Sequence, residues 1–485
     1  MQFNTLAFLG FFTIFYLLYL ALQRRLKLQN LWLLIASYVL YGLFSWRFLP
    51  VLIFITLTDF TLGWMMGRFG NNDRSKRTIR KVLVGLSLVI DLGLLGFFKY
   101  FHFFVSDFTR ALNLIGIHAD LLTLNIILPV GISFYTLKSL SYTLDVYRGS
   151  QVPTQNLLDY AVYMAFFPAL LAGPIDRAGK LLPQIHKPRR INADQFAAGF
   201  SLILWGYFKK LVIADNMALI ANRVFQNEGG SHGLDIILGL LAFTVQIYGD
   251  FSGYSDIARG FARLMGFELM VNFRLPYFAL NPADFWQRWH ISLSEWLRDY
   301  VFFPLRRMVL NWNIKDVALW GLLLPPLFTM LVSGLWHGTG WNFVLWGLYH
   351  GGLMILYRWF EKISIPRNLV ILGNSRLGTL FKMGIMFGFI CLGWLFFRAS
   401  TIGQAFHMIA NISFTPSTQS VGFANDLIFF TLPLILVQIW QARKGDLLVL
   451  AKFRFPVQLF VDTLILVWIV VFGARQVTEF IYSQF

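Results

Sequence analysis

Apolar runs long enough to cross a lipid bilayer recur from one end of this chain to the other. A spanning helix needs about twenty such residues, and only helices or closed barrels satisfy the backbone polar groups inside lipid. Barrel strands alternate in polarity over about ten residues, whereas these runs are continuous and rich in Leu and Phe. The sequence therefore predicts an all-α, polytopic membrane protein. We expect about eleven or more transmembrane helices, with re-entrant or interfacial helices around a central cavity.

Composition excludes several other classes of protein. Of the 485 residues, 57% are hydrophobic and 13% charged, which is too few charges to cover a soluble protein of this length. The net charge of +17 lies in short loops between apolar runs, which indicates cytoplasmic loops near anionic lipid rather than nucleic-acid binding. The chain has one cysteine, Cys391, so it has no internal disulfide and no cysteine metal cluster.

The basic loops set an expected topology. Lysines and arginines cluster at residues 24–27 and 68–81, so both loops should be cytoplasmic and the N-terminus extracytoplasmic. Residues 5–22 lack a preceding basic segment and a small-residue cleavage site, which favours a retained first span over a signal peptide. Further spans are expected at residues 31–45, 48–67, 82–98, 196–214, 234–248, 319–335, 342–356, 381–397, 427–439 and 459–472, and residues 121–137 and 157–172 form two more apolar runs.

This simple alternation fails before the basic loop at residues 177–190, which would then lie outside. The mixed segment 101–117 is a candidate interfacial helix. A re-entrant segment around Pro168 and Pro174 would restore the alternation, because prolines weaken a continuous helix. The section 249–310 is less apolar and interleaves charges with aromatics, which predicts helices in or below the interface.

His337 is the first candidate for chemistry. It follows the apolar run 319–335 within a stretch of glycines and tryptophans, and an ionisable residue at membrane depth is a functional candidate by default. Its pKa is ordinarily near neutrality, which suits a general base that takes a proton from a hydroxyl. The alternative is a structural histidine bonded to a neighbouring helix. Ser333 lies four residues earlier on the same helical face, where a Ser–His nucleophile pair competes with a serine bonded to its own backbone.

Two more histidines and a pair of acids complete the candidates. His290 lies among Asp284, Arg288 and tryptophans, which suits either an acyl-binding site or an interfacial belt. His350 would lie nearly opposite His337 on a continuous helix, so we expect a packing role, and no spacing supports a zinc site with His290 and His337. Asp250 and Asp256 follow a span beside glycines that permit a broken helix. Either acid is expected to pair with Arg259 or Arg274 and fix the floor of a cavity.

Several ordered motifs carry a resemblance to a known family. The motifs are Asp250-Phe-Ser-Gly-Tyr-Ser-Asp256, Asn272-Phe-Arg-Leu-Pro-Tyr277, Asp284-Phe-Trp-Gln-Arg-Trp-His-Ile-Ser-Leu-Ser294, Trp296-Leu-Arg-Asp-Tyr300, Leu335-Trp-His-Gly338 and Trp394-Leu-Phe-Phe-Arg398. Together they closely resemble the bacterial membrane-bound O-acyltransferases, and within them the alginate O-acetyltransferase branch. The resemblance covers most of the chain and implies a single membrane domain over residues 1–485, with a core at about 82–400 and peripheral helices at 1–81 and 401–485.

The resemblance implies an enzyme of the bacterial inner membrane that takes acetyl from acetyl-CoA on the cytoplasmic side toward hydroxyls of an extracytoplasmic polysaccharide. The family's invariant histidine maps onto His337 and its second active-site position onto His290. Extracytoplasmic partner proteins would complete the transfer, and neither a bound cofactor nor a metal is implied. The candidate substrate-binding residues are Trp336, Trp289, Arg288, Asp250, Tyr254, Asn272, Arg274 and Ser333.

Donor and acceptor stay open at this point. Relatives often carry Gly-Gly-Asn-Arg where this chain has Leu305-Arg306-Arg307-Met308, which leaves the donor-side loop undefined. Alginate, cellulose, peptidoglycan and other exopolysaccharides are all possible acceptors, and related enzymes transfer D-alanyl from a carrier protein to teichoic acid. A transporter or a structural subunit of a polymer-export complex would have similar composition. The absence of detectable repeated halves and the histidine-centred motifs count against a transporter.

Overall fold

The computed structural model describes residues 5–69, 74–116, 126–227, 231–361, 375–474 and 480–481. Over these residues the chain is helical, apart from one isolated bridge between Gly233 and Ile412. Eight helical runs among them are long and apolar enough to cross a membrane. The prediction of a polytopic all-α membrane protein is confirmed, while the exact number of crossings stays a prediction.

The chain divides into two compact units. Unit 1 comprises residues 1–200 and 258–270, and unit 2 comprises residues 201–257 and 271–485. The prediction of a single membrane domain with a core at about 82–400 rests on the family resemblance. The two units do not test it, so it stays a prediction.

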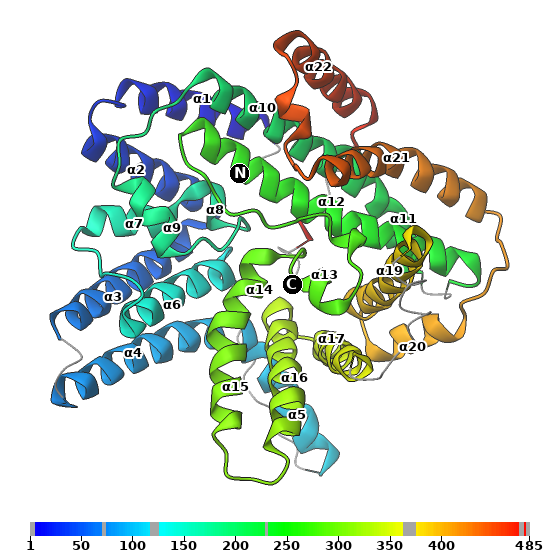
Figure 1. Cartoon of the computed structure of the whole chain (residues 1–485), viewed down its shortest axis with the longest axis horizontal. Helices are drawn as coiled ribbons and strands as arrows, with labels where there is room; N and C mark the ends of the chain where they lie inside the picture. The colour runs from blue at the N-terminus through cyan, green and yellow to red at the C-terminus, as the bar shows by residue number, and fades with distance from the viewer. Residues whose placement is uncertain are drawn as a thin grey trace. The chain divides into compact units, whose positions relative to one another are not determined.

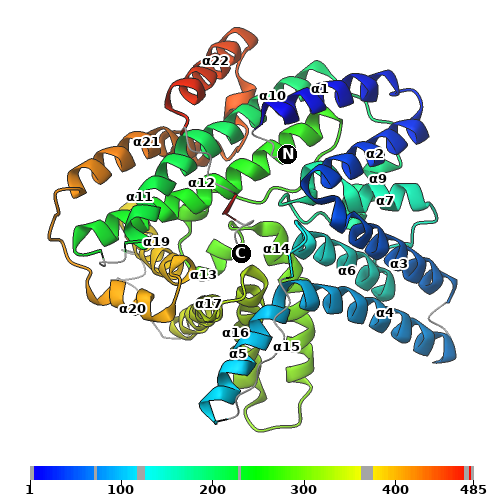
Figure 2. The ribbon, with the colours of Figure 1, turned by 180° about the vertical axis from the view of Figure 1, so that it is seen from behind.

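Unit 1 is built on the first nine helices. They are α1 (Leu6–Ala21), α2 (Leu26–Ser45), α3 (Leu49–Arg68), α4 (Arg74–Leu95), α5 (Phe101–Leu114), α6 (Ile132–Arg148), α7 (Leu157–Ala165), α8 (Phe167–Leu170) and α9 (Ala178–Ile185). Helices α3, α4 and α6 pack on one another, and they lie side by side in Figures 1 and 2.

Buried polar groups tie these three helices together. The Asp59 carboxylate of α3 accepts hydrogen bonds from Ser87 of α4, at 2.7 Å, and from Ser139 of α6. Ser87 also bonds the hydroxyl of Thr143 at 3.0 Å. All four side chains are buried, so the network satisfies polar groups that would otherwise destabilise an apolar interior.

Three expectations for unit 1 meet different outcomes. A π-helical turn at Gly96–Tyr100 joins α5 to α4, and the location of α5 in the membrane interface stays a prediction. The helix expected at 157–172 is broken at Phe166 between α7 and α8, beside Pro168, as the prolines predicted. The apolar run at 121–137 falls partly outside the described residues, and α6 begins only at Ile132.

Unit 2 holds the remaining helices, with α10 and α12 contributing to both units. They are α10 (Ala193–Tyr207), α11 (Asp215–Phe225), α12 (Leu234–Leu264), α13 (Pro282–Trp286), α14 (Ile291–Leu297), α15 (Phe303–Leu310), α16 (Val317–His337), α17 (Trp341–Phe360), α19 (Arg376–Arg398), α20 (Ile402–Ala410), α21 (Ser420–Lys444) and α22 (Phe455–Phe472). Short helices and irregular backbone over residues 265–310 agree with the low hydropathy of that section.

Helix α12 is continuous, so the broken helix expected near Asp250 was wrong. Gly249 and Gly253 instead let a neighbouring backbone approach closely. A Cβ on Gly253 would lie 2.8 Å from the carbonyl oxygen of Gly206, and one on Gly249 would lie 3.1 Å from that of Lys209. The glycines therefore serve packing against the segment Phe208–Ala214, which is π-helical.

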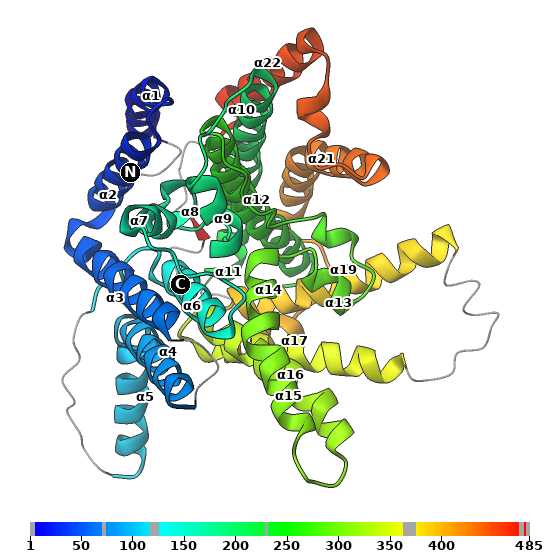
Figure 3. The same ribbon diagram turned by 60° about the vertical axis from the view of Figure 1, so that its left-hand side comes forward.

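Helices α16 and α17 form a closely packed pair, with α17 running beside α19 in Figure 3. A Cβ on Gly334 would lie 2.2 Å from the Phe343 carbonyl oxygen, so only glycine permits this approach. The helix ends at His337 and the next begins at Trp341, so the continuous helix assumed in relating His350 to His337 does not exist.

Candidate active site

The two histidines singled out from the sequence meet inside unit 2. His337 is the last residue of α16, and His290 immediately precedes α14. Their ring centroids are 6.3 Å apart, and the exposed fraction is 3% for His337 and 0% for His290. Segments separated by more than forty residues thus bring two imidazoles to one point, as expected if they act together.

Aromatic rings enclose this pair. Trp346 stacks on His337 with centroids 5.0 Å apart, and Phe397 approaches the same ring edge-on at 5.6 Å. Trp336 lies 5.8 Å from His290, whose other face meets Phe251 at 4.6 Å. Phe251 lies near the midpoint of α12, which is long and apolar enough to cross a membrane. Such an enclosure excludes water and strengthens electrostatic interactions within it.

Burial sets the charge state of His290, which lies outside the helices long enough to span. Desolvation lowers the pKa of His290 to about 3, so its imidazole is neutral at physiological pH. A neutral imidazole has one N–H donor and one acceptor nitrogen. His290 is therefore suited to donating a hydrogen bond to a developing oxyanion rather than to acting as a fixed cation.

The backbone at His290 is strained. Its φ of 41° and ψ of 53° lie in the left-handed region that non-glycine residues seldom adopt. Hydrogen bonds hold this turn: the Ile291 N–H donates to the Asn272 carbonyl at 2.9 Å, and the Ser294 N–H donates to the His290 carbonyl at 2.9 Å. Strain of this kind persists only where the surroundings impose it, and it marks functional sites.

Asn272 completes that support. Its side-chain oxygen accepts from the backbone N–H of Ser292 at 3.2 Å and from the Ser292 hydroxyl at 2.8 Å. Its amide nitrogen donates to Ser255 at 3.4 Å. We expected Asn272 to contact substrate. The structure instead directs its buried amide toward the turn that carries His290.

A cavity of about 590 Å³ opens beside Ser333, one helical turn before His337. Ser333 is fully buried and lines this cavity, together with Trp286 and Met330. Glu295 is the only carboxylate among the lining residues. Four arginines also line the cavity, namely Arg274, Arg298, Arg306 and Arg358. We call this the arginine cavity. Its charge suits an anionic group.

Other predicted residues are more peripheral. Trp289 is fully buried in an aromatic cluster, with its ring 4.7 Å from Trp394 and 5.0 Å from Phe273. Arg288 pairs with Asp284 at 2.5 Å. The ring of Tyr254 packs 4.7 Å from Phe480. In the structure, Trp289 packs in the aromatic cluster and Arg288 forms an ion pair.

Asp250 is paired, although not with an arginine as expected. Lys210 contacts Asp250 at 2.7 Å and Asp215 at 2.9 Å, and the backbone N–H of Ile481 donates to Asp250 at 2.6 Å. Lys209 contacts Asp256 at 2.7 Å. The expected partner for Asp250 was wrong because the two lysines lie inside an apolar run that we interpreted only as a span. Adjacent lysines within such a run are a signal for buried carboxylate partners.

His350 takes the packing role expected of it. Its buried ring lies 5.0 Å from Trp346 and 5.2 Å from Trp286. Among the described residues, no cluster of three His, Cys, Asp or Glu side chains is arranged to hold a metal ion. The sequence analysis did not identify Arg306 and Arg358 as lining a cavity. The unusual Leu305-Arg306-Arg307-Met308 stretch was a signal for Arg306.

Comparison with known proteins agrees with this geometry. The sequence model of the family described as "MBOAT, membrane-bound O-acyltransferase family" matches residues 33–397. The chain is 38% identical to "Probable alginate O-acetylase AlgI" of Pseudomonas putida, over 81% of this chain and 76% of that protein. It is 32% identical to the peptidoglycan O-acetyltransferase of Helicobacter pylori, over 84% and 79%, respectively. It is also 32% identical to the teichoic acid D-alanyltransferase of Bacillus subtilis, over 58% of this chain and 71% of that protein.

Proposed function

The chain belongs to the membrane-bound O-acyltransferase family, and we propose that it moves acetyl from a cytoplasmic thioester toward hydroxyls of an extracytoplasmic polysaccharide. It is an acyltransferase and a multi-pass membrane protein, so the proposal concerns the donor, the acceptor and the residues. The observation that carries it is the meeting of His290 and His337, 6.3 Å apart within an aromatic enclosure.

His337 acts as the general base in this proposal. The acceptor hydroxyl oxygen attacks the thioester carbonyl carbon while His337 takes its proton, and the carbonyl oxygen becomes an oxyanion. The neutral imidazole of His290 donates a hydrogen bond to that oxyanion. The carbon–sulfur bond then breaks, the ester is released, and the leaving thiolate takes the proton from His337. No net proton is consumed.

The donor enters through the arginine cavity. Acyl thioesters in cells are carried on phosphate-bearing pantetheine arms, and arginines recognise phosphate through paired N–H donors. Arg306 and Arg358 supply such donors, while Ser333 and Met330 line the same cavity toward His337. Acetyl-CoA is the donor we favour, because relatives named as acetylases match more of this chain than the D-alanyltransferases do.

The acceptor is an exopolysaccharide related to alginate. Five relatives named as alginate O-acetylases, at 36–39% identity, support this choice. Peptidoglycan is the alternative, supported by the Helicobacter relative. We further propose that the protein lies in the inner membrane with its N-terminus extracytoplasmic. It would work with extracytoplasmic partner proteins, in accordance with its basic loops and the resemblance described above.

Transfer of labelled acetyl tests the proposal. The full chain, purified in lipid nanodiscs, should release coenzyme A from acetyl-CoA, and together with its extracytoplasmic partner proteins it should acetylate mannuronate oligosaccharides. His337→Ala should abolish both reactions while the protein inserts and unfolds at the same temperature. His290→Ala should lower the rate about 10²–10³-fold, as expected for loss of an oxyanion donor. Undiminished transfer by the folded His337 variant would overturn the assignment.

A further inference from the structure

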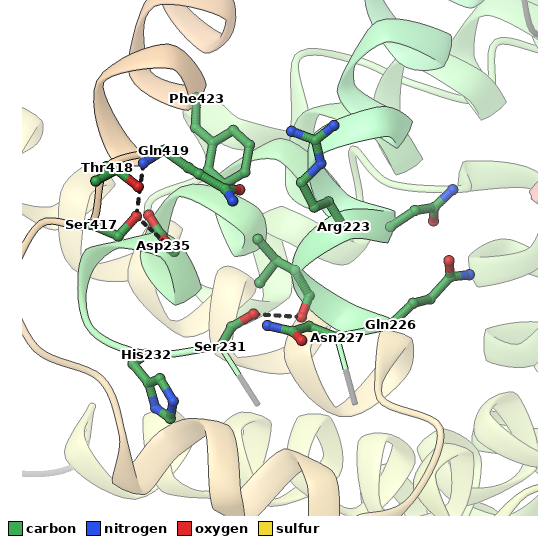
Figure 4. A pocket seen from close by; sticks show the side chains of 12 residues that line it. Arg223, Gln226, Asn227, Ser231, His232, Asp235, Ser417, Thr418, Gln419 and Phe423 are labelled. Carbon is green, nitrogen blue, oxygen red and sulfur yellow. Dashed lines mark hydrogen bonds between the residues drawn. The ribbon is translucent and has the colours of Figure 1, made fainter. Parts of the chain in front are cut away.

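We propose that a second, polar pocket in unit 2 binds a saccharide segment of the acceptor polymer, an inference that rests on the proposed function. This pocket has a volume of about 460 Å³ (Figure 4). We call it the amide pocket after its lining side chains, which are Asn222, Arg223, Val224, Gln226, Asn227, Ser231, His232, Asp235, Ser417, Thr418, Gln419 and Phe423.

Hydrogen bonds fix the walls of the amide pocket. Asp235, in the first turn of α12, accepts from the Ser417 hydroxyl at 2.5 Å and from the Ser420 hydroxyl at 2.6 Å. These bonds join the start of α12 to the start of α21. Across the pocket, Ser231 donates to the Val224 carbonyl at 2.9 Å. The frame is therefore set before a ligand arrives, which reduces the entropic cost of binding.

The lining matches the chemistry of a sugar. Side-chain amides present a carbonyl acceptor and an N–H donor side by side, and hydroxyls can donate or accept. Both groups can therefore bond a sugar hydroxyl whether it donates or accepts the hydrogen bond. Four of the twelve lining residues are Asn or Gln and three are Ser or Thr, in a chain that is 57% hydrophobic. Gln226 and Gln419 are exposed, and Figure 4 shows both among the side chains around the opening.

Charge and an aromatic ring narrow the choice of sugar. Arg223 lies over the Phe423 ring, with its guanidinium carbon 5.9 Å from the ring centroid. Asp235 is engaged by two hydroxyls, so the basic group is the one presented to a ligand. A sugar that bears a carboxylate fits this arrangement better than a neutral one.

The amide pocket is linked to the histidines through one short chain of contacts. Its lining residue Asn222 accepts a hydrogen bond from Arg398 at 2.8 Å. The residue before Arg398 is Phe397, whose ring packs 5.6 Å from His337. The arginine cavity is lined by Ser333, one helical turn before His337, and the two pockets share no lining residue. The amide pocket is thus joined, through Arg398, to the segment that packs on His337.

A peptide is the less suitable occupant. Protein segments bind through buried aromatic or aliphatic anchors, whereas the apolar lining here is limited to Val224 and Phe423. The pocket volume lies within the range of small-ligand sites and accommodates a short oligosaccharide.

Binding and kinetics with defined oligosaccharides test the inference. The full chain in nanodiscs is titrated with mannuronate hexamers, with cellohexaose, and separately with an extracytoplasmic partner protein. The test variant is Gln226→Ala/Gln419→Ala, the charge variant is Arg223→Gln, and the matched control is Asn311→Ala/Asn313→Ala, whose residues are exposed and line neither pocket.

We expect the double variant to weaken hexamer binding about tenfold and to raise KM for the hexamer equally. Its kcat and its release of coenzyme A from acetyl-CoA should stay unchanged. Arg223→Gln should lose mannuronate binding but not cellohexaose binding. His337→Ala should still bind the hexamer, which separates this inference from the proposed function. Wild-type affinity in the double variant, no saccharide binding at all, or loss of partner binding alone would overturn it.

Discussion

The Asn272 side-chain oxygen accepts two hydrogen bonds from Ser292, one from its backbone N–H at 3.2 Å and one from its hydroxyl at 2.8 Å. These bonds hold the first turn of α14, directly after the left-handed backbone of His290. We therefore predict that Asn272 is a positioning residue, which determines where the His290 ring lies relative to His337 without touching the substrate.

Asn272→Ala should lower kcat by about 10²-fold, because displacement of a reacting group by about 1 Å has an effect of that size. The KM for acetyl-CoA should change little, since the arginine cavity is intact. Ser292→Ala removes one of the two bonds and should have a smaller effect in the same direction. Steady-state kinetics of the purified variants measure both. A raised KM with unchanged kcat would mean that Asn272 binds substrate.

Arg306 and Arg358 should govern affinity for the donor. Replacing either with Ala should raise KM for acetyl-CoA about tenfold, because each would lose a charge-assisted hydrogen bond to phosphate. The increase should shrink at high salt, where charge interactions are screened. Arg307→Ala is the matched control, since Arg307 adjoins Arg306 in sequence but does not line the cavity. Equal effects at Arg306 and Arg307 would contradict a specific phosphate site.

The sequence predicted the fold class and the pairing of histidines well, for physical reasons. Apolar length determines membrane helices, and a histidine next to glycines at the end of such a run has few structural uses. His337 and His290 were placed together by family motifs and not by spacing, because nothing local relates residues on different helices.

The failures have a common cause, which is tertiary packing. Gly249 and Gly253 suggested a broken helix, but the partner backbone that needs them lies more than thirty residues away in sequence. Lys210 was not recognised as the partner of Asp250, because an ion pair between helices leaves no periodic signal. Asp59 was overlooked for the same reason: its hydroxyl partners come from α4 and α6.

Lys210 should contribute more to stability than Asp250 does. Lys210→Met leaves the carboxylates of Asp250 and Asp215 without their shared cation and should destabilise the protein by about 3–5 kcal/mol. Asp250→Asn keeps an acceptor for the Ile481 N–H and leaves Lys210 with Asp215, so about 1–3 kcal/mol is expected. Thermal unfolding in detergent gives the order. The reverse order would contradict Lys210 as the shared cation of the two carboxylates. A kcat lost by a fully stable Asp250→Asn protein would instead assign Asp250 to catalysis.

The neutral state of His290 should make stability depend on pH. Burial lowers the pKa of His290 from 6.5 in an exposed imidazole to about 3, so between these values the unfolded chain binds a proton that the folded protein does not. Stability is therefore present above pH 6.5 and declines as the pH falls toward 3, with a slope of at most about 1.4 kcal/mol per pH unit from this group. His290→Gln removes that contribution, so the variant should lose less stability than the wild type between about pH 7 and about pH 5. Unfolding midpoints of the two proteins across that range measure the difference. Parallel curves would mean that His290 is already protonated, and hence hydrated or paired with an acid, in the folded protein.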